Sequence, residues 1–212
     1  SGETIVEAVE ERGDGVEAHS HPDLGSLHLA VGARLQSGDW IMTLGAGNIH
    51  EAGTRLAGDL ATRDQLLSIL DEGEGVVKLY EPMRRHTTMK VGGPAQFWIE
   101  PVTVAGLARI VRHCCETGTP LRVIGRGSNL LVRDGGIRGV VVHPSRGEFA
   151  AISVDGDTIR AGAGVKFKAV AAAAQSAGIG GFEWMEGIPG NVGGSLRMNA
   201  GAMGTETFDQ VV

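Results

Sequence analysis

The sequence predicts an α/β segment over residues 1–62, followed by an α+β domain over residues 63–212. Up to about residue 61, helical and strand-like apolar patterns alternate, which is typical of a parallel sheet covered by helices. After residue 75, strands and helices follow in a mixed order and two glycine-rich loops interrupt them. The polar stretch 61–75 separates the two patterns, so we expect limited proteolysis to cut there first.

In the first segment, apolar residues return at helical spacing three times, with strand-like runs between them. Ser1 is suited to cap the first helix, and Gly45-Ala-Gly47 is expected to turn the chain into the third. The expected helices cover about 1–13, 24–38 and 48–60, and the expected strands cover 16–20 and 40–44.

In the second segment, Asp64 can cap a short helix that carries Leu66 and Leu70. The pair Asp155-Gly156 predicts a hairpin, because it suits a tight turn with positive φ. The other expected helices cover about 103–118 and 165–177, and the expected strands cover 76–80, 95–100, 121–124, 130–132, 139–143, 152–154 and 158–160.

Two glycine-rich stretches mark the second segment. The longer one, Gly187 to Gly204, is too rich in glycine for an ordinary helix or strand, because glycine costs conformational entropy in both. The shorter one, Gly125-Arg-Gly-Ser-Asn129, follows the apolar run 121–124. Exposed backbone N–H groups on such loops bind phosphate well. Together the two stretches predict a large phosphate-bearing ligand held from two sides.

Composition narrows the function classes. The formal net charge of −6 argues against binding nucleic acid or a membrane surface. No apolar run approaches the length that spans a bilayer, and no signal peptide is visible, so neither membrane insertion nor secretion is expected. Cys114 and Cys115 are adjacent in a helical pattern and have no zinc-site spacing. We therefore expect a reduced cytoplasmic protein without a metal site.

Four motifs of the second segment follow one another in a characteristic order. They are His86-Thr-Thr-Met-Lys-Val-Gly-Gly-Pro-Ala, Gly125-Arg-Gly-Ser-Asn-Leu-Leu-Val, Ala161-Gly-Ala-Gly and Gly187-Ile-Pro-Gly-Asn-Val-Gly-Gly. This order resembles the UDP-N-acetylmuramate dehydrogenases, also called UDP-N-acetylenolpyruvoylglucosamine reductases. The resemblance implies an FAD-binding domain of the vanillyl-alcohol oxidase (PCMH) type. It also implies an enzyme of peptidoglycan precursor synthesis that uses NADPH to reduce the enolpyruvyl group of a UDP-sugar substrate.

The resemblance also implies which residues contact FAD. In the first loop they are Gly125, Arg126, Gly127, Ser128 and Asn129, and in the second Gly187, Ile188, Pro189, Gly190, Val192, Gly193 and Gly194. Asn199, Ala200 and Gly201 resemble the segment beside the flavin, and Gly92 and Gly93 resemble an earlier turn that faces the cofactor.

No residue of this chain is assigned a catalytic role. The family's catalytic arginine, serine and glutamate are expected beyond the part that matches Val212, and Arg197, Glu183 and Glu186 lie at positions that do not match them. We therefore expect the 212-residue chain alone to be inactive.

The first segment resembles a second family. Ser1-Gly-Glu-Thr and Gly38-Asp-Trp-Ile-Met-Thr-Leu-Gly-Ala-Gly-Asn-Ile are similar to the tail of UDP-N-acetylmuramate–L-alanine ligases, within their carboxy-terminal α/β domain. This resemblance implies a covalent fusion to a ligase module upstream, and it implies no ligase activity in the first segment itself. Two other interpretations stay open: a non-catalytic flavin- or nucleotide-binding module, and another flavin oxidoreductase of the same fold.

Overall fold

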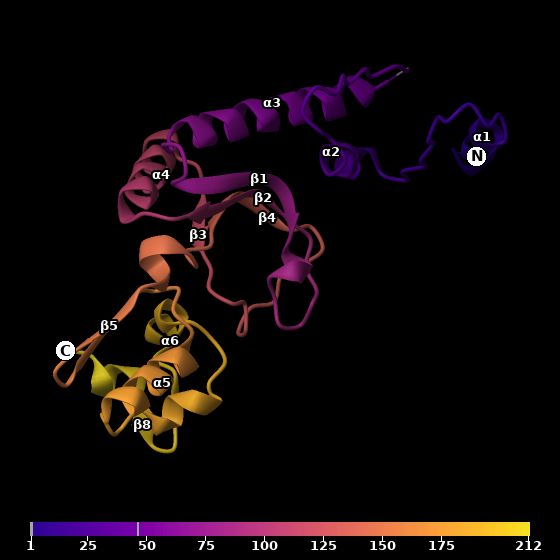
Figure 1. The fold of residues 1–212 in the computed structure, drawn as a ribbon. Helices are drawn as coiled ribbons and strands as arrows, with labels where there is room; N and C mark the ends of the chain where they lie inside the picture. The colour runs from indigo at the N-terminus through magenta and orange to yellow at the C-terminus, as the bar shows by residue number, and fades with distance from the viewer. Residues whose placement is uncertain (1, 46) are drawn as a thin grey trace. The chain divides into compact units, whose positions relative to one another are not determined.

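The structure, a computed structural model, describes residues 2–45 and 47–212. It divides into two compact units, residues 1–61 and residues 62–212 (Figure 1). Each unit is described by itself below. None of the described helices is both long enough and apolar enough to cross a lipid bilayer.

The regular elements in the described part of the first unit are all helices. They are α1 (Gly2–Glu10), α2 (Leu24–Gly32) and the first part of α3 (Ile49–Ser68). Asp23 caps α2, since its carboxylate accepts a hydrogen bond of 3.0 Å from the Gly25 N–H. The predicted cap at Ser1, and Ala46 of the predicted turn before α3, lie outside the described residues.

The strands expected at 16–20 and 40–44 do not form, so the described part of this unit is helical where an α/β order was predicted. The side chain of Trp40 is 99% exposed, and those of Met42 and Leu44 are each 79% exposed. These residues have strand-like composition, but a strand also needs neighbours that pair with it and bury one face. The described residues of the unit provide no such neighbour.

Helix α3 is longer than expected. The helix predicted over 48–60 and the short helix predicted from Asp64 are one continuous helix that ends at Ser68. Near this end Leu66 is fully buried, and Leu70, just beyond it, is also buried. Both belong to the core of the second unit.

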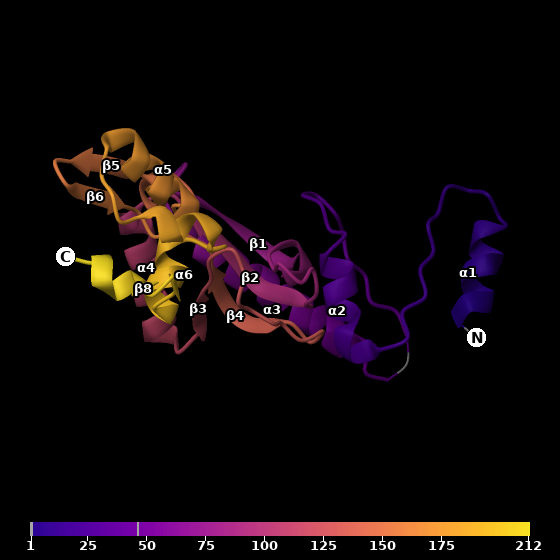
Figure 2. The same ribbon diagram turned by 90° about the horizontal axis from the view of Figure 1, so that it is seen from below.

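A four-stranded sheet organises the first half of the second unit (Figures 1 and 2). Its strand order is β1-β2-β4-β3, with β1 antiparallel to β2 and the remaining neighbours parallel. Helix α4 (Val104–Thr117) connects β2 to β3 and begins at Thr103, whose hydroxyl accepts from the Gly106 N–H at 3.0 Å. The strands are β1 (Gly75–Pro82), β2 (Pro94–Pro101), β3 (Leu121–Val123) and β4 (Ile137–Val142).

The inner strands β2 and β4 are buried on both faces, and their residues alternate between the faces with the period of two that a pleated strand imposes. Phe97 and Ile99 of β2 lie in one core with Ile110 of α4. Trp98, between them in sequence, lies in the opposite core with Val141 of β4. The strand expected at 130–132 does not form; Leu130 and Val132 instead pack on that second core from a loop.

The second half of the unit contains the predicted hairpin and several short elements. Strands β5 (Ile152–Asp155) and β6 (Thr158–Ala161) pair around Gly156, as predicted. Helix α5 (Phe167–Ala177) lies beside this hairpin in both views and ends at Gly178 in the left-handed region (Figures 1 and 2). After it come α6 (Val192–Met198) and the two-residue strands β7 (Gly201–Ala202) and β8 (Thr205–Glu206). Phe167, Trp184 and Met185 are at the centre of their core.

Candidate cofactor site

The first glycine loop, residues 125–129, leaves the sheet directly after β3. Ile124 anchors its start, because this buried residue donates its N–H to the Val142 carbonyl at 2.9 Å. Gly127 has φ +63°, and a Cβ atom there would lie 2.1 Å from the His86 carbonyl oxygen. The Thr88 N–H donates to the Gly127 carbonyl at 3.1 Å. The loop is therefore pressed onto residues 86–88, and only glycine fits at this contact.

The second glycine stretch contains a helix, contrary to the prediction that it was too rich in glycine for one. Val192 to Met198 form α6, which ends at Asn199 in the left-handed region with φ 45°. Tertiary contacts hold the start of the helix: the N–H groups of Val192 and Gly193 donate to the carbonyls of Val165 and Ala163 at 2.9 Å each. Such contacts outweigh the low helix propensity of Gly193 and Gly194.

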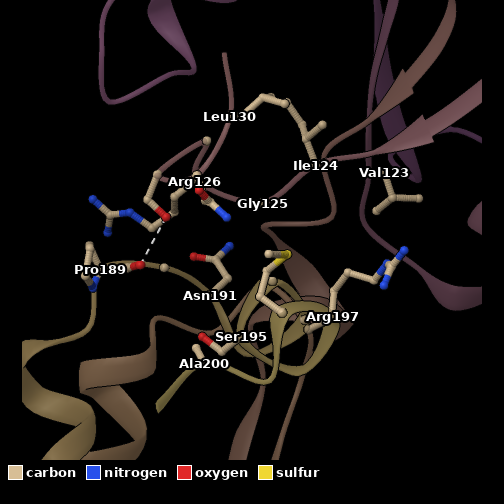
Figure 3. Close-up of a pocket in the computed structure, with 18 of the residues that line it drawn as sticks. Val123, Ile124, Gly125, Arg126, Leu130, Pro189, Asn191, Ser195, Arg197 and Ala200 are labelled. Carbon is tan, nitrogen blue, oxygen red and sulfur yellow. Dashed lines mark hydrogen bonds between the residues drawn. The ribbon is translucent and has the colours of Figure 1, made fainter. Parts of the chain in front are cut away.

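The two loops meet at one hydrogen bond and enclose one pocket. The Ser128 hydroxyl of the first loop donates to the Pro189 carbonyl of the second at 3.0 Å (dashed line in Figure 3). The pocket beside this bond has a volume of about 710 Å³, within the range of ligand pockets of about 300–1,000 Å³. Its apolar wall includes Ile124, Leu130 and Ile188.

Most of the residues predicted to contact a cofactor line this pocket. They are Gly125, Arg126, Gly127, Ser128, Asn129, Ile188, Pro189, Gly190, Gly193, Gly194 and Ala200. The structure thus brings together two segments that lie about sixty residues apart in the chain.

Gly187, Val192, Asn199 and Gly201 do not line the pocket. Val192 packs against the core around Phe167. Both polar atoms of the Asn199 side chain have partners within the protein. Its Nδ2 donates to Glu206 Oε2 at 2.5 Å, and its Oδ1 accepts from the Phe208 N–H at 3.0 Å. Gly201 begins β7 and pairs with Glu206.

Gly92 and Gly93 are also outside the pocket. A Cβ atom at Gly93 would lie 1.8 Å from the Asp134 carbonyl oxygen, so this turn packs on the loop that follows the pocket residues.

Some pocket residues were not predicted: Val123, Ile124, Leu130, Pro144, Ala163, Asn191, Ser195, Arg197 and Met198. Ala163 and Asn191 lie inside motifs that were recognised, so a signal existed for them. Arg197 was considered only as a catalytic arginine. Ser195, Arg197 and Met198 line the pocket because α6 is a helix, which the sequence interpretation did not expect.

The pocket is rich in hydrogen-bond donors and positive charge. Among the described residues, no acceptor pairs with the backbone N–H groups of residues 125–129. Arg126 and Arg197 are exposed, and neither forms an ion pair within the described part of the chain. In Figure 3 their side chains extend on opposite sides of Asn191. This arrangement favours an anionic ligand, because N–H groups and guanidinium groups both bind phosphate oxygens.

A half-buried polar cluster lies behind the first loop. The ring of His86 stacks on Trp98 with a centroid distance of 3.9 Å, and its Nε2 is 2.8 Å from Glu81 Oε1. His143 donates from Nδ1 to the Ile124 carbonyl at 3.2 Å, next to the start of the loop. Burial lowers the pKa of His143, although this hydrogen bond acts in the opposite direction. The cluster supports the loop from the side of the sheet.

Comparisons with known proteins agree with such a ligand. A model of the FAD binding domain family matches residues 95–212, more than half of the chain. The UDP-N-acetylenolpyruvoylglucosamine reductase of Nitrobacter hamburgensis is 46% identical over 154 residues, which are 73% of this chain and 50% of that protein. The enzyme of the same name from Desulforamulus reducens is 45% identical over 130 residues, 61% of this chain and 43% of that protein. The chain thus spans about half the length of the curated relatives it matches.

A solved structure gives the same result. The crystal structure of the UDP-N-acetylenolpyruvylglucosamine reductase of Thermus caldophilus matches 62% of this chain and 44% of its own, with a TM-score of 0.50 and 36% identity. The fold of the second unit is therefore that of a flavoenzyme, and the sequence prediction of this fold class is confirmed. Since the family model covers residues 95–212, the chain belongs to the FAD binding domain family.

Proposed function

We propose that this chain binds FAD in the pocket between the two loops, and that it forms the cofactor-binding part of a reductase. The observation that carries the proposal is the single pocket lined by both predicted loops. The unpaired N–H groups of residues 125–129 suit the FAD pyrophosphate, and Arg126 and Arg197 add positive charge beside it. The residues present therefore fit the cofactor.

The activity that we propose is the NADPH-dependent reduction of UDP-N-acetylglucosamine enolpyruvate to UDP-N-acetylmuramate, a step in the synthesis of peptidoglycan precursors. Support comes from the relatives named UDP-N-acetylenolpyruvoylglucosamine reductase. The substrate would be a UDP-sugar and the co-substrate NADPH. The compartment that we propose with it is the cytoplasm, which holds nucleotide sugars and reduced nicotinamide cofactors.

In this function the chain's own residues bind and orient rather than transfer protons. Bound FAD supplies the two-electron redox chemistry. The first loop, fixed on residues 86–88, presents its N–H groups in one geometry before ligand arrives, which lowers the entropy cost of binding. Ile124, Leu130 and Ile188 provide an apolar wall against which water is excluded. No residue of this chain is proposed as the proton donor.

The test of this proposal joins the chain to the part of a related reductase that the chain does not span. The chain is fused at Val212 to the part of the Nitrobacter hamburgensis reductase that lies beyond the matched region, which covers 50% of that protein. We expect the chimera to bind FAD and to oxidise NADPH only when UDP-N-acetylglucosamine enolpyruvate is added. The chain alone, with FAD added, should bind the cofactor but show no substrate-dependent oxidation.

The outcomes separate the alternatives. A folded chimera that binds FAD without turnover would favour a non-catalytic flavin-binding module. Failure of both proteins to bind FAD would reject the proposed site. Turnover by the chain alone at ordinary enzyme rates, on the order of 1–10³ s⁻¹, would mean that it contains a proton donor that we have not assigned.

For residues 1–61 we infer an origin as the tail of a UDP-N-acetylmuramate–L-alanine ligase, with a ligase module joined upstream. The support is the run Gly38-Asp-Trp-Ile-Met-Thr-Leu-Gly-Ala-Gly-Asn-Ile and its apolar side chains, which are exposed here. Intact-mass measurement of the protein purified from its native source tests this. A species without ligase sequence upstream of Ser1 would reject the fusion.

A further inference from the structure

Asn191 holds a position that would normally make it a helix cap, but it does not act as one. It is the N-cap residue of α6, with φ −110° and ψ 159°, and asparagine is among the residues preferred there. Yet its side chain makes no capping hydrogen bond. Its backbone alone is used structurally, since its carbonyl accepts from the Ser195 N–H at 2.9 Å and it forms a β-bridge with Lys166.

The side-chain amide of Asn191 is buried in the wall of the pocket without a protein partner. The residue is 3% exposed, and its Oδ1 has no hydrogen-bond partner among the described residues. In Figure 3 the amide lies between the first loop and α6, in the middle of the pocket. Its atoms approach Gly125, where a Cβ would lie 3.8 Å from Asn191 Cβ and 3.9 Å from Nδ2.

Such a group needs an explanation. A buried polar atom that forms no hydrogen bond costs stability, and native proteins contain few of them. The side chain could cap α6 by a rotation, or an apolar residue could replace it. Instead it lines the pocket with the amide directed at the opposite loop. The explanation that fits both facts is a partner that enters with the ligand.

We propose that the buried Oδ1 of Asn191 accepts a hydrogen bond from an O–H or N–H group of the bound flavin nucleotide. This inference rests on the proposed binding of FAD in the pocket. The N–H groups of residues 125–129 and the side chains of Arg126 and Arg197 can only donate, which suits phosphate oxygens, whereas the side chains of Ser128, Asn129 and Ser195 can also accept. An amide oxygen such as Asn191 Oδ1 cannot pair with a phosphate oxygen, so it must meet a part of the ligand that donates. The ribose and ribityl hydroxyls of FAD and its ring N–H groups provide such donors.

The test measures two properties of three variants in the full 212-residue chain: FAD affinity by quenching of flavin fluorescence, and the melting temperature of the FAD-free protein. Asn191→Leu should raise the Kd of FAD about tenfold or more, because the ligand donor loses its acceptor. It should leave the melting temperature unchanged or higher, since it removes an unpaired buried amide. Asn191→Asp keeps an acceptor oxygen and should bind FAD more tightly than Asn191→Leu does.

Asn199, at the other end of the same helix, offers the matched control. Its amide is hydrogen-bonded to Glu206 and Phe208 and its backbone lies in the left-handed region, so Asn199→Leu should lower the melting temperature of the FAD-free protein for both reasons. A drop of the same kind in Asn191→Leu would show that the Asn191 amide is structural and would overturn the inference.

Two further outcomes would also overturn it. If the wild-type chain binds FAD and Asn191→Leu binds equally well, the contact does not exist, while the proposed function stands. If Asn191→Asp binds more weakly than Asn191→Leu, the amide donates to a phosphate instead of accepting. A wild-type chain that binds no FAD would reject the proposed function and this inference together.

Discussion

The packing of the protein itself requires glycine at position 127, independently of any ligand. Its φ of +63° lies in the left-handed region, and a Cβ atom would meet the His86 carbonyl oxygen at 2.1 Å. Gly156 has a similar φ of +54° but no atom within 4 Å of its Cβ position. A comparison of the two glycines therefore separates the cost of a positive φ, which both share, from the cost of a Cβ atom that clashes with a neighbouring backbone, which applies only at Gly127.

We predict that Gly127→Ala lowers the free energy of unfolding by more than Gly156→Ala. Both variants carry the strain of an L-residue at positive φ, about 1–2 kcal/mol. Gly127→Ala must also move the backbone of residues 86–88, which adds about 1–3 kcal/mol, typical of overpacking. Urea denaturation of the FAD-free chain measures both values. Equal losses would mean that the contact with His86 is not tight in solution.

Gly194 presents the opposite case, because nothing in the protein opposes a side chain there. It lies in α6 on the pocket wall, with no atom within 4 Å of its Cβ position. We predict that Gly194→Leu raises the Kd of FAD about tenfold or more without lowering stability, because leucine has a higher helix propensity than glycine and occupies space that the ligand needs. Gly58→Leu in α3 is the matched control, since Gly58 is also helical and open. Flavin fluorescence that shows equal Kd values for the two variants would remove α6 from the site.

At the scale of the elements, the loop after β3 is held by a half-buried histidine at the end of the next strand. His143 follows β4 and donates to the carbonyl of Ile124, the residue that leads into the first loop. Burial holds its pKa below the ordinary value of 6.5, despite this hydrogen bond and the nearby Glu100 carboxylate. The neighbouring ring of His86, with a centroid distance of 6.1 Å, further lowers the pKa of His143.

This predicts that the chain loses stability as the pH falls through 6.5. The unfolded chain protonates His143 at its ordinary pKa, whereas the folded chain resists, so the unfolded state binds more protons and the free energy of unfolding rises with pH. The contribution is complete above 6.5 and is lost progressively toward the lower pKa of the folded state. His143→Gln should reduce the slope of stability against pH in this window, as measured by urea denaturation at several pH values. An unchanged slope would count against a neutral, half-buried His143.

Elements with a local signal were predicted well, and those that depend on tertiary contacts were not. The hairpin at Gly156 and helix α4, which begins at Thr103, form where local turn and cap residues place them. Helix α6 was missed because glycine propensity argues against it, while bonds to Ala163 and Val165 decide it. The strand at 40–44 was predicted from composition, but composition says nothing about whether pairing partners are present.

At the scale of the whole molecule, the site residues that belong to sequence motifs could be predicted. Those that reach the pocket only through the packing of distant segments could not. The residues of both loops were named from their motifs, and most of them line one pocket. Val123 and Pro144 gave no signal, since their place on the wall follows only from how the loops pack. Asn191 lies inside a motif, but the feature that singles it out is a buried Oδ1 without a hydrogen-bond partner among the described residues. That feature depends on the folded structure, so the sequence does not show it.

The stretch 61–75 also differs from the sequence expectation, which placed the most accessible cleavage site there. Helix α3 runs through residues 61–68 without a break, and Leu66 and Leu70 are buried beyond the boundary. Arg109 further holds the stretch after the helix: its Nε donates to the Ile69 carbonyl at 2.9 Å, and its guanidinium pairs with Asp71 and Glu74. A protease can cut only where the backbone opens out of such contacts, which makes 61–75 a poor site.

We therefore predict that a protease of broad specificity first cuts the chain within residues 11–23 or 33–48. In the described part of the chain these stretches contain no helix or strand, and Trp40 is almost fully exposed. The early product should retain most of α3 together with residues 69–212. Amino-terminal sequencing and mass spectrometry of the first stable fragment identify the cut. A first cut between residues 61 and 75 would restore the original boundary and would mean that α3 is interrupted in solution.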